Sequence, residues 1–261
     1  MDSPLAYIGG KSKLSESIIE MIPDHKTYCE VFAGGLWVFF RKDPSMYEVI
    51  NDLDCDLIAF YRVIQNHLEE FLKQFKYLLV SREQWKDWKD QLETRGLTDI
   101  QKAARYYYVQ RLSYAGKVKG RSFGTTPESR PRINLLRMEE ELSEVHLRFS
   151  QVMIENLSWE KVVEKYDKPA TFFYLDPPYY SDPCYKHNFE FGDYVRMNEV
   201  LQGIAGKFIL SINDHPKIRD AFSGFNIKPV ELLYTVGDKC SEGKELIISN
   251  YEIKAKQQTL F

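Results

Sequence analysis

The sequence predicts an α/β fold. Short apolar runs of strand character alternate with helical patterns toward both ends of the chain, and two of the predicted strands end in turns rich in glycine or proline. At 261 residues the chain is long enough to bury a sizeable core, as one large domain or as a domain with an insertion. Its charged and apolar fractions, 28% and 44%, are typical of a soluble globular protein.

A glycine-lysine segment lies near the start of the chain. It reads YIGGK from Tyr7 to Lys11 and precedes a helical pattern over residues 14–22 that Pro23 ends. Paired glycines before a lysine resemble a phosphate loop, but the spacing Gly-x-x-x-x-Gly-Lys-Ser/Thr is not satisfied. The segment therefore does not predict a nucleoside triphosphate site.

A glycine turn follows the first predicted strand. Residues 27–31 have strand character and lead into Gly34 and Gly35, just before a helix predicted at residues 37–41. Glycine permits positive φ and close approach of the backbone to a ligand, toward which the free N–H groups of a helix N-terminus also point. A second strand over residues 46–50 ends at Asp52, a position where ribose hydroxyls are commonly bound. A helix N-cap is the alternative role for Asp52 or Asp54.

The middle of the chain is helical and contains a basic stretch. Helical patterns cover residues 57–64, 71–79, 84–92, 100–112 and 135–145, and residues 101–137 carry nine Lys or Arg against one acid. Within this stretch, residues 113–127 predict a glycine-punctuated hairpin that lies against phosphates and wedges into a stacked duplex. A solvated basic loop is the competing interpretation, but the excess of cations favours a polyanion contact. The candidate DNA contacts are Arg111, Tyr114, Lys117, Lys119, Arg121, Phe123 and Arg130.

The segment TFFYLDPPYY, residues 171–180, is the most informative part of the sequence. Its first five residues are uncharged, β-branched or aromatic, which predicts a buried strand that stops at Asp176. Pro177 and Pro178 bar further strand pairing, so a carboxylate, a stiff turn and the ring of Tyr179 follow at the strand's carboxyl end. An Asp-Pro turn closed by a packed tyrosine, or an exposed Pro-Pro-Xaa-Tyr docking peptide, are the alternatives; the apolar run upstream argues against the docking peptide.

Strands and helices alternate again in the last third of the chain. Strands are predicted over residues 152–155, 207–213, 230–236 and 245–251, helices over 158–166, 192–204 and 215–222, and a hairpin loop over 237–243. No run approaches the roughly 18 to 20 apolar residues of a transmembrane helix, and the N-terminus lacks the apolar core of a signal peptide, so a cytoplasmic location is predicted. The four scattered cysteines and five histidines show no metal-ligand spacing, so no metal site is predicted.

Taken in this order, the strand with its glycine loop, the acid one strand later and the Asp-Pro-Pro-Tyr turn resemble the Dam-like, D12 class of N6-adenine DNA methyltransferases. The resemblance spans the whole chain, including the segments at residues 211–213 and 245–251. It implies a Rossmann-like, seven-stranded, mostly parallel sheet with an antiparallel last strand. It also implies a catalytic domain at residues 1–54 and 157–261, which binds S-adenosylmethionine, and an inserted, mainly helical target-recognition domain with a hairpin at residues 55–156.

The resemblance also implies roles for individual residues. The catalytic motif is Asp176, Pro177, Pro178 and Tyr179, and its carboxylate and the Pro177 carbonyl accept the N–H hydrogens of an adenine amine. Tyr179 stacks on that adenine after it has flipped out of double-stranded DNA. The expected cofactor contacts are Tyr7, Lys11, Glu30, Phe32, Gly34, Asp52, Asp176 and Phe189, although Phe189 is equally consistent with a core residue.

Other functions remain open at this point. The same motif in variant form methylates cytosine N4, RNA bases or protein glutamine, and a catalytically silent DNA-binding protein is a further alternative. The last five residues, from Gln257 to Phe261, resemble peptides that dock on bacterial sliding clamps; a frayed tail is the simpler interpretation. The target sequence and the biological role, in restriction-modification, in a phage or in housekeeping, do not follow from the sequence.

Overall fold

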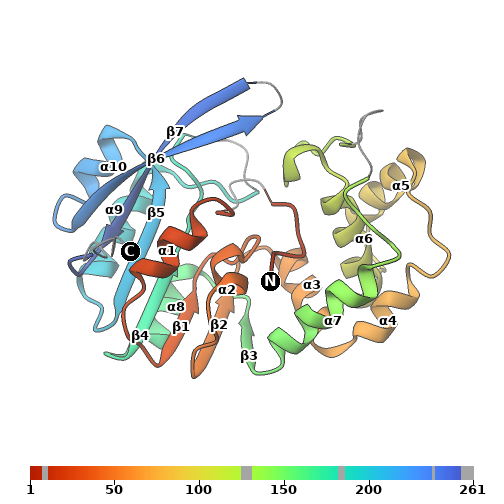
Figure 1. The fold of residues 1–261 in the computed structure, drawn as a ribbon, viewed down its shortest axis with the longest axis horizontal. Coiled ribbons are helices and arrows are strands. Elements are labelled where there is room, and N and C mark those ends of the chain that lie inside the picture. Colours follow the sequence, from red (N-terminus) through yellow and green to blue (C-terminus); the bar gives the residue numbers. More distant parts are fainter. Residues whose placement is uncertain (8–10, 125–130, 182–185, 237–238, 254–261) are drawn as a thin grey trace, which may run out of the picture.

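The computed structural model describes residues 1–7, 11–124, 131–181, 186–236 and 239–253, and its strands form a seven-stranded sheet in the order β3-β2-β1-β4-β5-β7-β6 (Figure 1). Neighbouring strands are parallel from β3 to β5, whereas β7 runs antiparallel to both β5 and β6. The predicted fold class is thereby confirmed. The strands are β1 (Thr27–Glu30), β2 (Tyr47–Asn51), β3 (Val152–Glu155), β4 (Thr171–Leu175), β5 (Lys207–Asn213), β6 (Asn226–Val236) and β7 (Lys239–Ser249).

Helices cover both faces of the sheet because its strands are apolar on both sides. In β4, Phe172 and Tyr174 belong to one hydrophobic cluster, while Phe173 and Leu175 belong to another. The first cluster contains side chains of α1 (Ser15–Met21), α2 (Trp37–Arg41) and α3 (Cys55–Asn66). The second contains side chains of α8 (Trp159–Tyr166), α9 (Phe191–Gln202) and α10 (Pro216–Ala221). Such two-sided burial is typical of parallel sheets.

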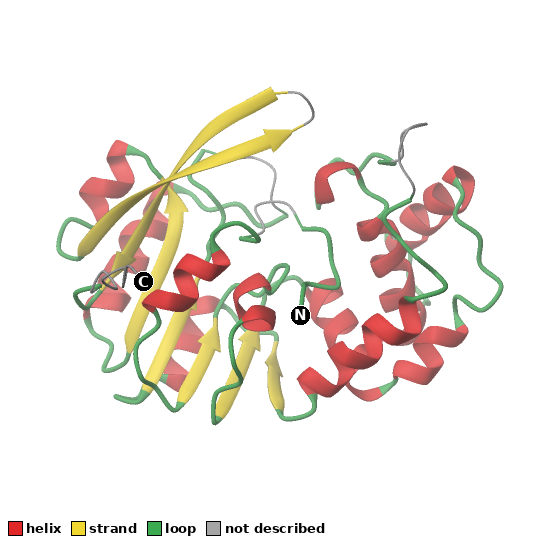
Figure 2. Cartoon of the chain, in the orientation of Figure 1, coloured by secondary structure: helices red, strands yellow, loops and turns green. Residues whose placement is uncertain are grey.

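The helical region lies between β2 and β3 in the chain and beside the sheet in space. Figure 2 shows it as helices and loops, apart from the strands. Its core is mostly aromatic, and the rings of Phe60 and Tyr107 stack with their centroids 5.4 Å apart. That core continues without interruption into the cluster on the first face of the sheet. Besides α3, the region comprises α4 (Leu68–Lys73), α5 (Arg82–Leu92), α6 (Asp99–Arg111), the 3₁₀ turn η1 (Tyr114–Gly116) and α7 (Met138–Phe149).

Strand order places a crevice between β1 and β4. The chain proceeds outward from β1 through β2 to β3 on one side, and from β4 to β5 on the other. Loops that leave the carboxyl ends of β1 and β4 therefore diverge, and ligands of open α/β sheets bind at such a point. Both the glycine turn after β1 and Asp176 after β4 lie at this edge.

Two predicted boundaries were wrong at the last strand pair. Strand β6 begins at Asn226 rather than Val230 and contains Pro229. A proline is tolerated there because β6 is an edge strand, in which the missing N–H of Pro229 costs no hydrogen bond of the sheet. Strand β7 begins at Lys239, since its polar first half pairs with β6 as far as Val236 instead of forming a loop. The ribbon that results extends beyond the rest of the sheet (Figure 1).

The predicted hairpin at residues 113–127 is closed by a single bridge. Ser113 and Phe123 form one isolated antiparallel bridge, next to hydrogen bonds from Tyr114 N to Ser122 O and from Gly124 N to Leu112 O. Residues 125–130 lie outside the described part of the chain. We call residues 113–124 the basic loop.

Candidate active site

A cavity of about 400 Å³ opens at the carboxyl edge of the sheet. Its walls come from the turns after β1, β2 and β4, from the start of α8 and from residues 186–189. All the predicted cofactor contacts, Tyr7, Lys11, Glu30, Phe32, Gly34, Asp52, Asp176 and Phe189, line it. Segments that are far apart in the sequence thus meet around one space of a size typical for small-molecule sites.

The glycine turn forms the floor of the cavity and depends on two special backbone conformations. Gly34 has φ 44° and Leu36 has φ 56°, so an ordinary L-residue occupies the left-handed region at the second position. The Gly34 N–H donates to Asp52 at 3.0 Å and its carbonyl accepts from the Tyr61 hydroxyl at 2.6 Å. A Cβ at Gly35 would lie 3.1 Å from Tyr7, so a larger residue there would push against the cavity wall.

Asp52 and Asp54 both line the cavity, and only Asp54 caps a helix. The Asp54 side chain caps α3 by accepting from the Asp56 N–H. The two Asp52 oxygens accept backbone N–H bonds from Gly34 and Asp54, at 3.0 and 2.9 Å. Burial raises the pKa of Asp52 to about 6 despite those hydrogen bonds.

Asp176 presents one of its carboxylate oxygens to the protein and keeps the other available. Oδ1 accepts from Lys11 Nζ at 2.6 Å and from the Ser211 hydroxyl at 3.3 Å, while Oδ2 has no hydrogen bond within the described residues. Burial raises the pKa of Asp176 to about 6, and the Lys11 ammonium opposes this rise. The carboxylate is therefore ionised at neutral pH and can accept one further hydrogen bond.

The two proline carbonyls after Asp176 differ in their surroundings. The Pro178 carbonyl accepts from the Tyr194 hydroxyl at 2.7 Å. No such bond reaches the Pro177 carbonyl from any residue that the structure describes. Asp176 Oδ2 and the Pro177 carbonyl are thus two neighbouring acceptors in a turn held by packing.

The Tyr179 hydroxyl takes part in a polar cluster rather than facing solvent. It accepts from Lys11 Nζ at 2.7 Å and donates to Glu245 Oε1, on β7, at 2.6 Å. The Lys11 ammonium also lies 4.6 Å from the centre of the Tyr179 ring. These contacts fix the orientation of the ring beside Asp176.

Glu30 and two phenylalanines complete the wall near β1. Glu30 is buried and accepts from the Tyr28 hydroxyl at 2.6 Å, and burial raises its pKa to about 8. Phe32 and Phe189 meet edge to face with ring centroids 5.8 Å apart. Phe189 lines the cavity and also packs against the second core cluster, so its contact with a cofactor stays a prediction.

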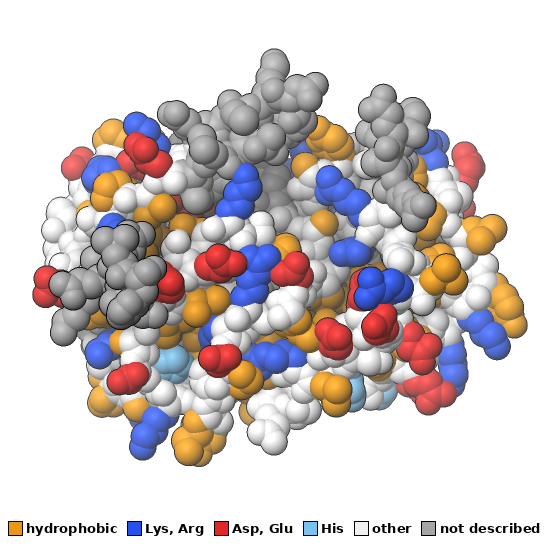
Figure 3. Space-filling model, viewed as in Figure 1, with side chains coloured by type: hydrophobic (Ala, Val, Ile, Leu, Met, Phe, Trp, Pro, Cys, Tyr) orange, Lys and Arg blue, Asp and Glu red, His pale blue; other side chains and the backbone are white. Residues whose placement is uncertain are grey.

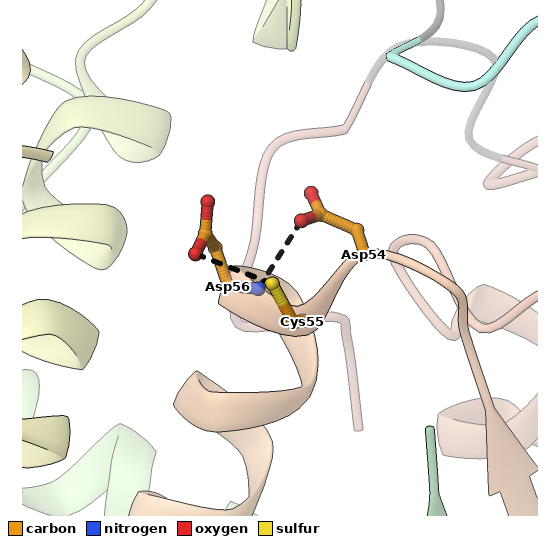
Figure 4. Close-up of side chains that lie close together, drawn as sticks. All are labelled: Asp54, Cys55 and Asp56. Atoms are coloured by element: carbon orange, nitrogen blue, oxygen red, sulfur yellow. Dashed lines mark hydrogen bonds between the residues drawn. The ribbon is translucent and has the colours of Figure 1, made fainter. Parts of the chain in front are cut away.

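Asp54, Cys55 and Asp56 form the group nearest to a metal-binding arrangement among the described residues (Figure 4). Lysines neutralise its carboxylates. Lys186 Nζ lies 2.7 Å from Asp54 and 3.0 Å from Asp56, and Lys102 of α6 lies 2.5 Å from Asp56. These ion pairs connect the segment after Asp176 to the helical region. Asp54 and Asp56 therefore hold the two segments together.

The structure separates the predicted DNA contacts into exposed and packed residues. Tyr114 is 48% exposed and Lys119 is also exposed. By contrast, Phe123 packs edge to face on Trp85 with centroids 5.9 Å apart, and the Arg121 guanidinium lies 5.3 Å from the Tyr106 ring centre. Phe123 is thus half-buried and packs against the helical core, a position that does not favour a wedge. Arg111 and Lys117 are half-buried, and Arg130 lies outside the described residues.

The basic loop is fastened to the N-terminal segment of the cavity wall. The Gln110 side-chain amide donates to the carbonyls of Ala6 and Gly116, each at 2.8 Å. Gly116 has φ 66°, and a Cβ there would lie 2.8 Å from the Ala6 backbone. The loop can therefore approach the residue before Tyr7 only with glycine at this position.

Sequence reasoning did not identify several residues of the site. Trp37 and Trp159 line the cavity, and Ser211, Glu245 and Tyr61 bond to residues already predicted. The two tryptophans begin helices that follow β1 and β3, so their place after a strand was a usable signal. Glu245 gave no such signal, because it lies opposite Asn213 in an antiparallel strand.

Sequence similarity relates the chain to known methyltransferases. The Type II methyltransferase M1.LlaDCHI of Lactococcus lactis subsp. cremoris is 28% identical over 273 residues, 94% of each chain. The Type II methyltransferase M.CviBI of Paramecium bursaria Chlorella virus NC1A is 25% identical over 94% of this chain and 98% of its own. The DNA adenine methylase of Escherichia coli (strain K12) is 25% identical over 43% of this chain and 41% of its own.

The family comparison covers most of the chain. A sequence profile for the D12 class N6 adenine-specific DNA methyltransferases matches residues 7–236. This span includes every residue that lines the cavity, from Tyr7 to Asp193. The motif order, the sheet topology and the profile all agree, and the chain belongs to the D12 class of N6 adenine-specific DNA methyltransferases.

Proposed function

We propose that this DNA adenine-N6 methyltransferase takes its methyl group from S-adenosylmethionine and acts on an adenine that has flipped out of double-stranded DNA within a short target sequence. The observation that carries the proposal is the pair of available acceptors after β4, Asp176 Oδ2 and the Pro177 carbonyl. An exocyclic amine has two N–H hydrogens, and the pair offers one acceptor for each.

The cavity fits the proposed cofactor. Its volume of about 400 Å³ lies within the range of small-molecule sites, and a Cβ at Gly35 would lie only 3.1 Å from the Tyr7 side chain. Asp52 would accept from the ribose hydroxyls, Phe32 and Phe189 would cover an aromatic base, and Lys11 is a cation for a carboxylate. When bound, S-adenosylmethionine supplies an electrophilic methyl group.

The residues after β4 would activate the amine. The N6 lone pair of adenine is delocalised into the ring, which makes the nitrogen a poor nucleophile. Hydrogen bonds from both N–H groups to Asp176 and Pro177 favour the form in which the lone pair stays on nitrogen. Preorganised groups of this kind contribute roughly 10²–10³-fold to a rate.

The helical region is the proposed target-recognition domain, residues 55–156, between the two parts of the catalytic domain, 1–54 and 157–261. Support comes from the exposed residues of its basic loop and from the ion pair of Asp56, on α3, with Lys186 in the cavity wall. On the face drawn in Figure 3, acidic and basic side chains of the described residues are interspersed, so that face is not a uniformly basic surface. Phosphate contacts are accordingly assigned to the basic loop. The Tyr179 ring would stack on the flipped base.

The remaining expectations stay predictions. Among the described residues, none of the helices combines the length and the apolar character needed to cross a membrane. The cytoplasm is still the predicted compartment. Gln257 to Phe261, the predicted clamp-binding peptide, lie outside the described residues.

Expression of the chain alongside a plasmid tests the proposal. We expect base-resolved sequencing to find N6-methyladenine in one short motif, and Asp176→Ala to abolish it. Asp214→Ala, a change at the end of the neighbouring strand β5, is the matched control and should methylate normally. Methylated cytosine or methylated RNA in place of methyladenine would redirect the proposal to another planar amine. No modification of any kind would contradict it.

A further inference from the structure

The turn that follows β4 lies beyond the pairing of that strand with β5. Parallel pairing ends with Leu175 opposite Leu210, and Pro177 and Pro178 have no N–H with which to continue it. Side chains of neighbouring elements hold the turn instead. Tyr194 of α9 holds one point, because its hydroxyl donates to the Pro178 carbonyl at 2.7 Å.

Asn213, the last residue of β5, holds a second point of the turn. Its Oδ1 accepts from the Tyr180 N–H at 2.9 Å, and its Nδ2 donates to the Tyr180 carbonyl at 3.1 Å. A carboxamide offers the same kinds of donor and acceptor as a peptide group. The Asn213 side chain thus takes the place of a strand partner and joins the chain to β5 again at Tyr180.

Strand β5 also holds the beginning of the turn. Side chains two residues apart on a strand point to the same face of the sheet. Ser211, two residues before Asn213, donates to Asp176 Oδ1 at 3.3 Å. The Asp176 carboxylate and the Tyr180 backbone are therefore both attached to one face of one strand, and the Pro177 carbonyl lies between these attachments in the chain.

The residue after Tyr180 has an unusual backbone conformation. Ser181 has φ 64°, in the left-handed region that a residue other than glycine keeps only when its surroundings hold it there. The two Asn213 bonds engage the peptide groups on both sides of the Tyr180 Cα, directly before Ser181. The strain at Ser181 therefore indicates that the turn is held in a set conformation and does not relax.

We propose that Asn213 is a positioning residue for the methyl transfer. By holding Tyr180 it fixes the path of the backbone from Asp176, and with it the separation of Asp176 Oδ2 and the Pro177 carbonyl, the two acceptors assigned to the adenine amine. Displacement of a reacting group by about 1 Å lowers a rate by up to about 10²-fold. This inference rests on the proposed function, since it concerns the reaction that the turn serves.

Single-turnover methylation by Asn213→Leu, with enzyme in excess over DNA and saturating S-adenosylmethionine, tests the role. Leucine is similar in size but makes neither bond. We expect a rate constant about 30-fold below wild type, and affinities for S-adenosylmethionine and DNA within about twofold of wild type. Loss of folded enzyme would instead lower the amplitude of the reaction and leave its rate constant unchanged.

Asn250 provides a matched control at the opposite end of β5. Its side chain also bonds to a backbone N–H and a backbone carbonyl, those of Phe208 and Gly206, at 3.0 and 2.9 Å. Asn250→Leu should lower the urea midpoint of unfolding about as much as Asn213→Leu does. Its rate constant should stay within about twofold of wild type, because Asn250 does not hold the turn.

Asn213→Asp takes the place of the leucine variant if that variant does not fold. A carboxylate still accepts from the Tyr180 N–H but cannot donate to its carbonyl, so a rate constant about tenfold below wild type is expected. A wild-type rate constant in the folded Asn213 variant, or an equal fall in Asn250→Leu, would overturn the positioning role alone. Absence of methylation in the wild type would overturn the proposed function and this role with it.

Discussion

The sheet region and the helical region of this protein bury different kinds of side chains. At the carboxyl edge of the sheet, Lys11 and Glu245 are buried, Asp176 is half-buried, and Lys11 is ion-paired with both carboxylates. The core of the helical region is aromatic, and its ionisable groups lie at its surface or its boundary. Buried charge demands fixed partners and so fixes geometry. Under the proposed function, we therefore expect the chemistry to depend on the sheet region and DNA contact to depend on the surface of the helical region.

The largest effect that would test this division is expected from Asp52→Asn. The change removes a charged acceptor from the cofactor wall, and one hydrogen bond to a charged group contributes about 1.5–3 kcal/mol, so the KM for S-adenosylmethionine should rise about 10–100-fold. The KM for DNA should change by less than about twofold, because DNA contact is assigned to the other region. Asp214→Asn is the matched control. An equal rise in both KM values would show that the two regions are not separable in this way.

A pH series sharpens the comparison further. Burial raises the pKa values of Asp52 and Asp176 to about 6, so single-turnover methylation should fall at least about tenfold per pH unit below that value. The free energy of unfolding should instead increase as the pH falls. Both folded-state pKa values exceed the unfolded values, so the stability these groups contribute is present at low pH and is lost as the pH rises through about 6.

The free energy of unfolding should therefore increase between pH 7 and pH 5 while activity decreases, as measured by urea titration at each pH. Asp56, at the boundary with the helical region, has a lowered pKa and loses its contribution only in stronger acid. Activity that is constant down to pH 5 would mean that neither raised carboxylate is needed in its ionised form.

Substitution of the two aromatic residues of the basic loop should affect different properties, DNA affinity for Tyr114 and stability for Phe123. Tyr114→Ala removes an exposed ring, so DNA affinity should fall about tenfold, the scale of base stacking, with stability nearly unchanged. Phe123→Ala removes a ring packed on Trp85, so the free energy of unfolding should fall by about 2 kcal/mol. Denaturant titration and fluorescence binding separate the two results. Loss of DNA affinity in a fully stable Phe123→Ala variant would instead make Phe123 a DNA contact.

The smallest expected effect is that of Lys119→Ala. Loss of one exposed phosphate contact should weaken DNA affinity about threefold and lower the salt dependence of binding by about one ion. Both effects should be the same for every DNA sequence. Lys161→Ala on α8, an exposed lysine of the sheet region, should leave both unchanged. A change of target sequence in Lys119→Ala would make this residue a base reader.

Sequence patterns predicted the sheet region better than the helical region for a physical reason. Strands β4 and β5 match their predicted bounds because each is an apolar run with a sharp polar end, and the site residues follow such ends directly. Whether Phe123 faces DNA or the core depends on Trp85, which lies on another helix. No local pattern carries that information. The antiparallel partner Glu245 was missed likewise, because its role depends on strand pairing across the sheet.

The contact between Gly116 and Ala6 has a consequence for engineering. Recognition modules of such enzymes invite exchange, since a new module would give a new target sequence. In this chain the proposed module, the helical region, is attached at more than its two chain connections, because the Gln110 amide bonds to the Ala6 carbonyl and Gly116 lies against the Ala6 backbone. A chimaera that lacks those two residues would lose the contact between the helical region and Ala6, and with it the packing that positions Tyr7. Swaps that retain both should be the ones that keep their methyl donor.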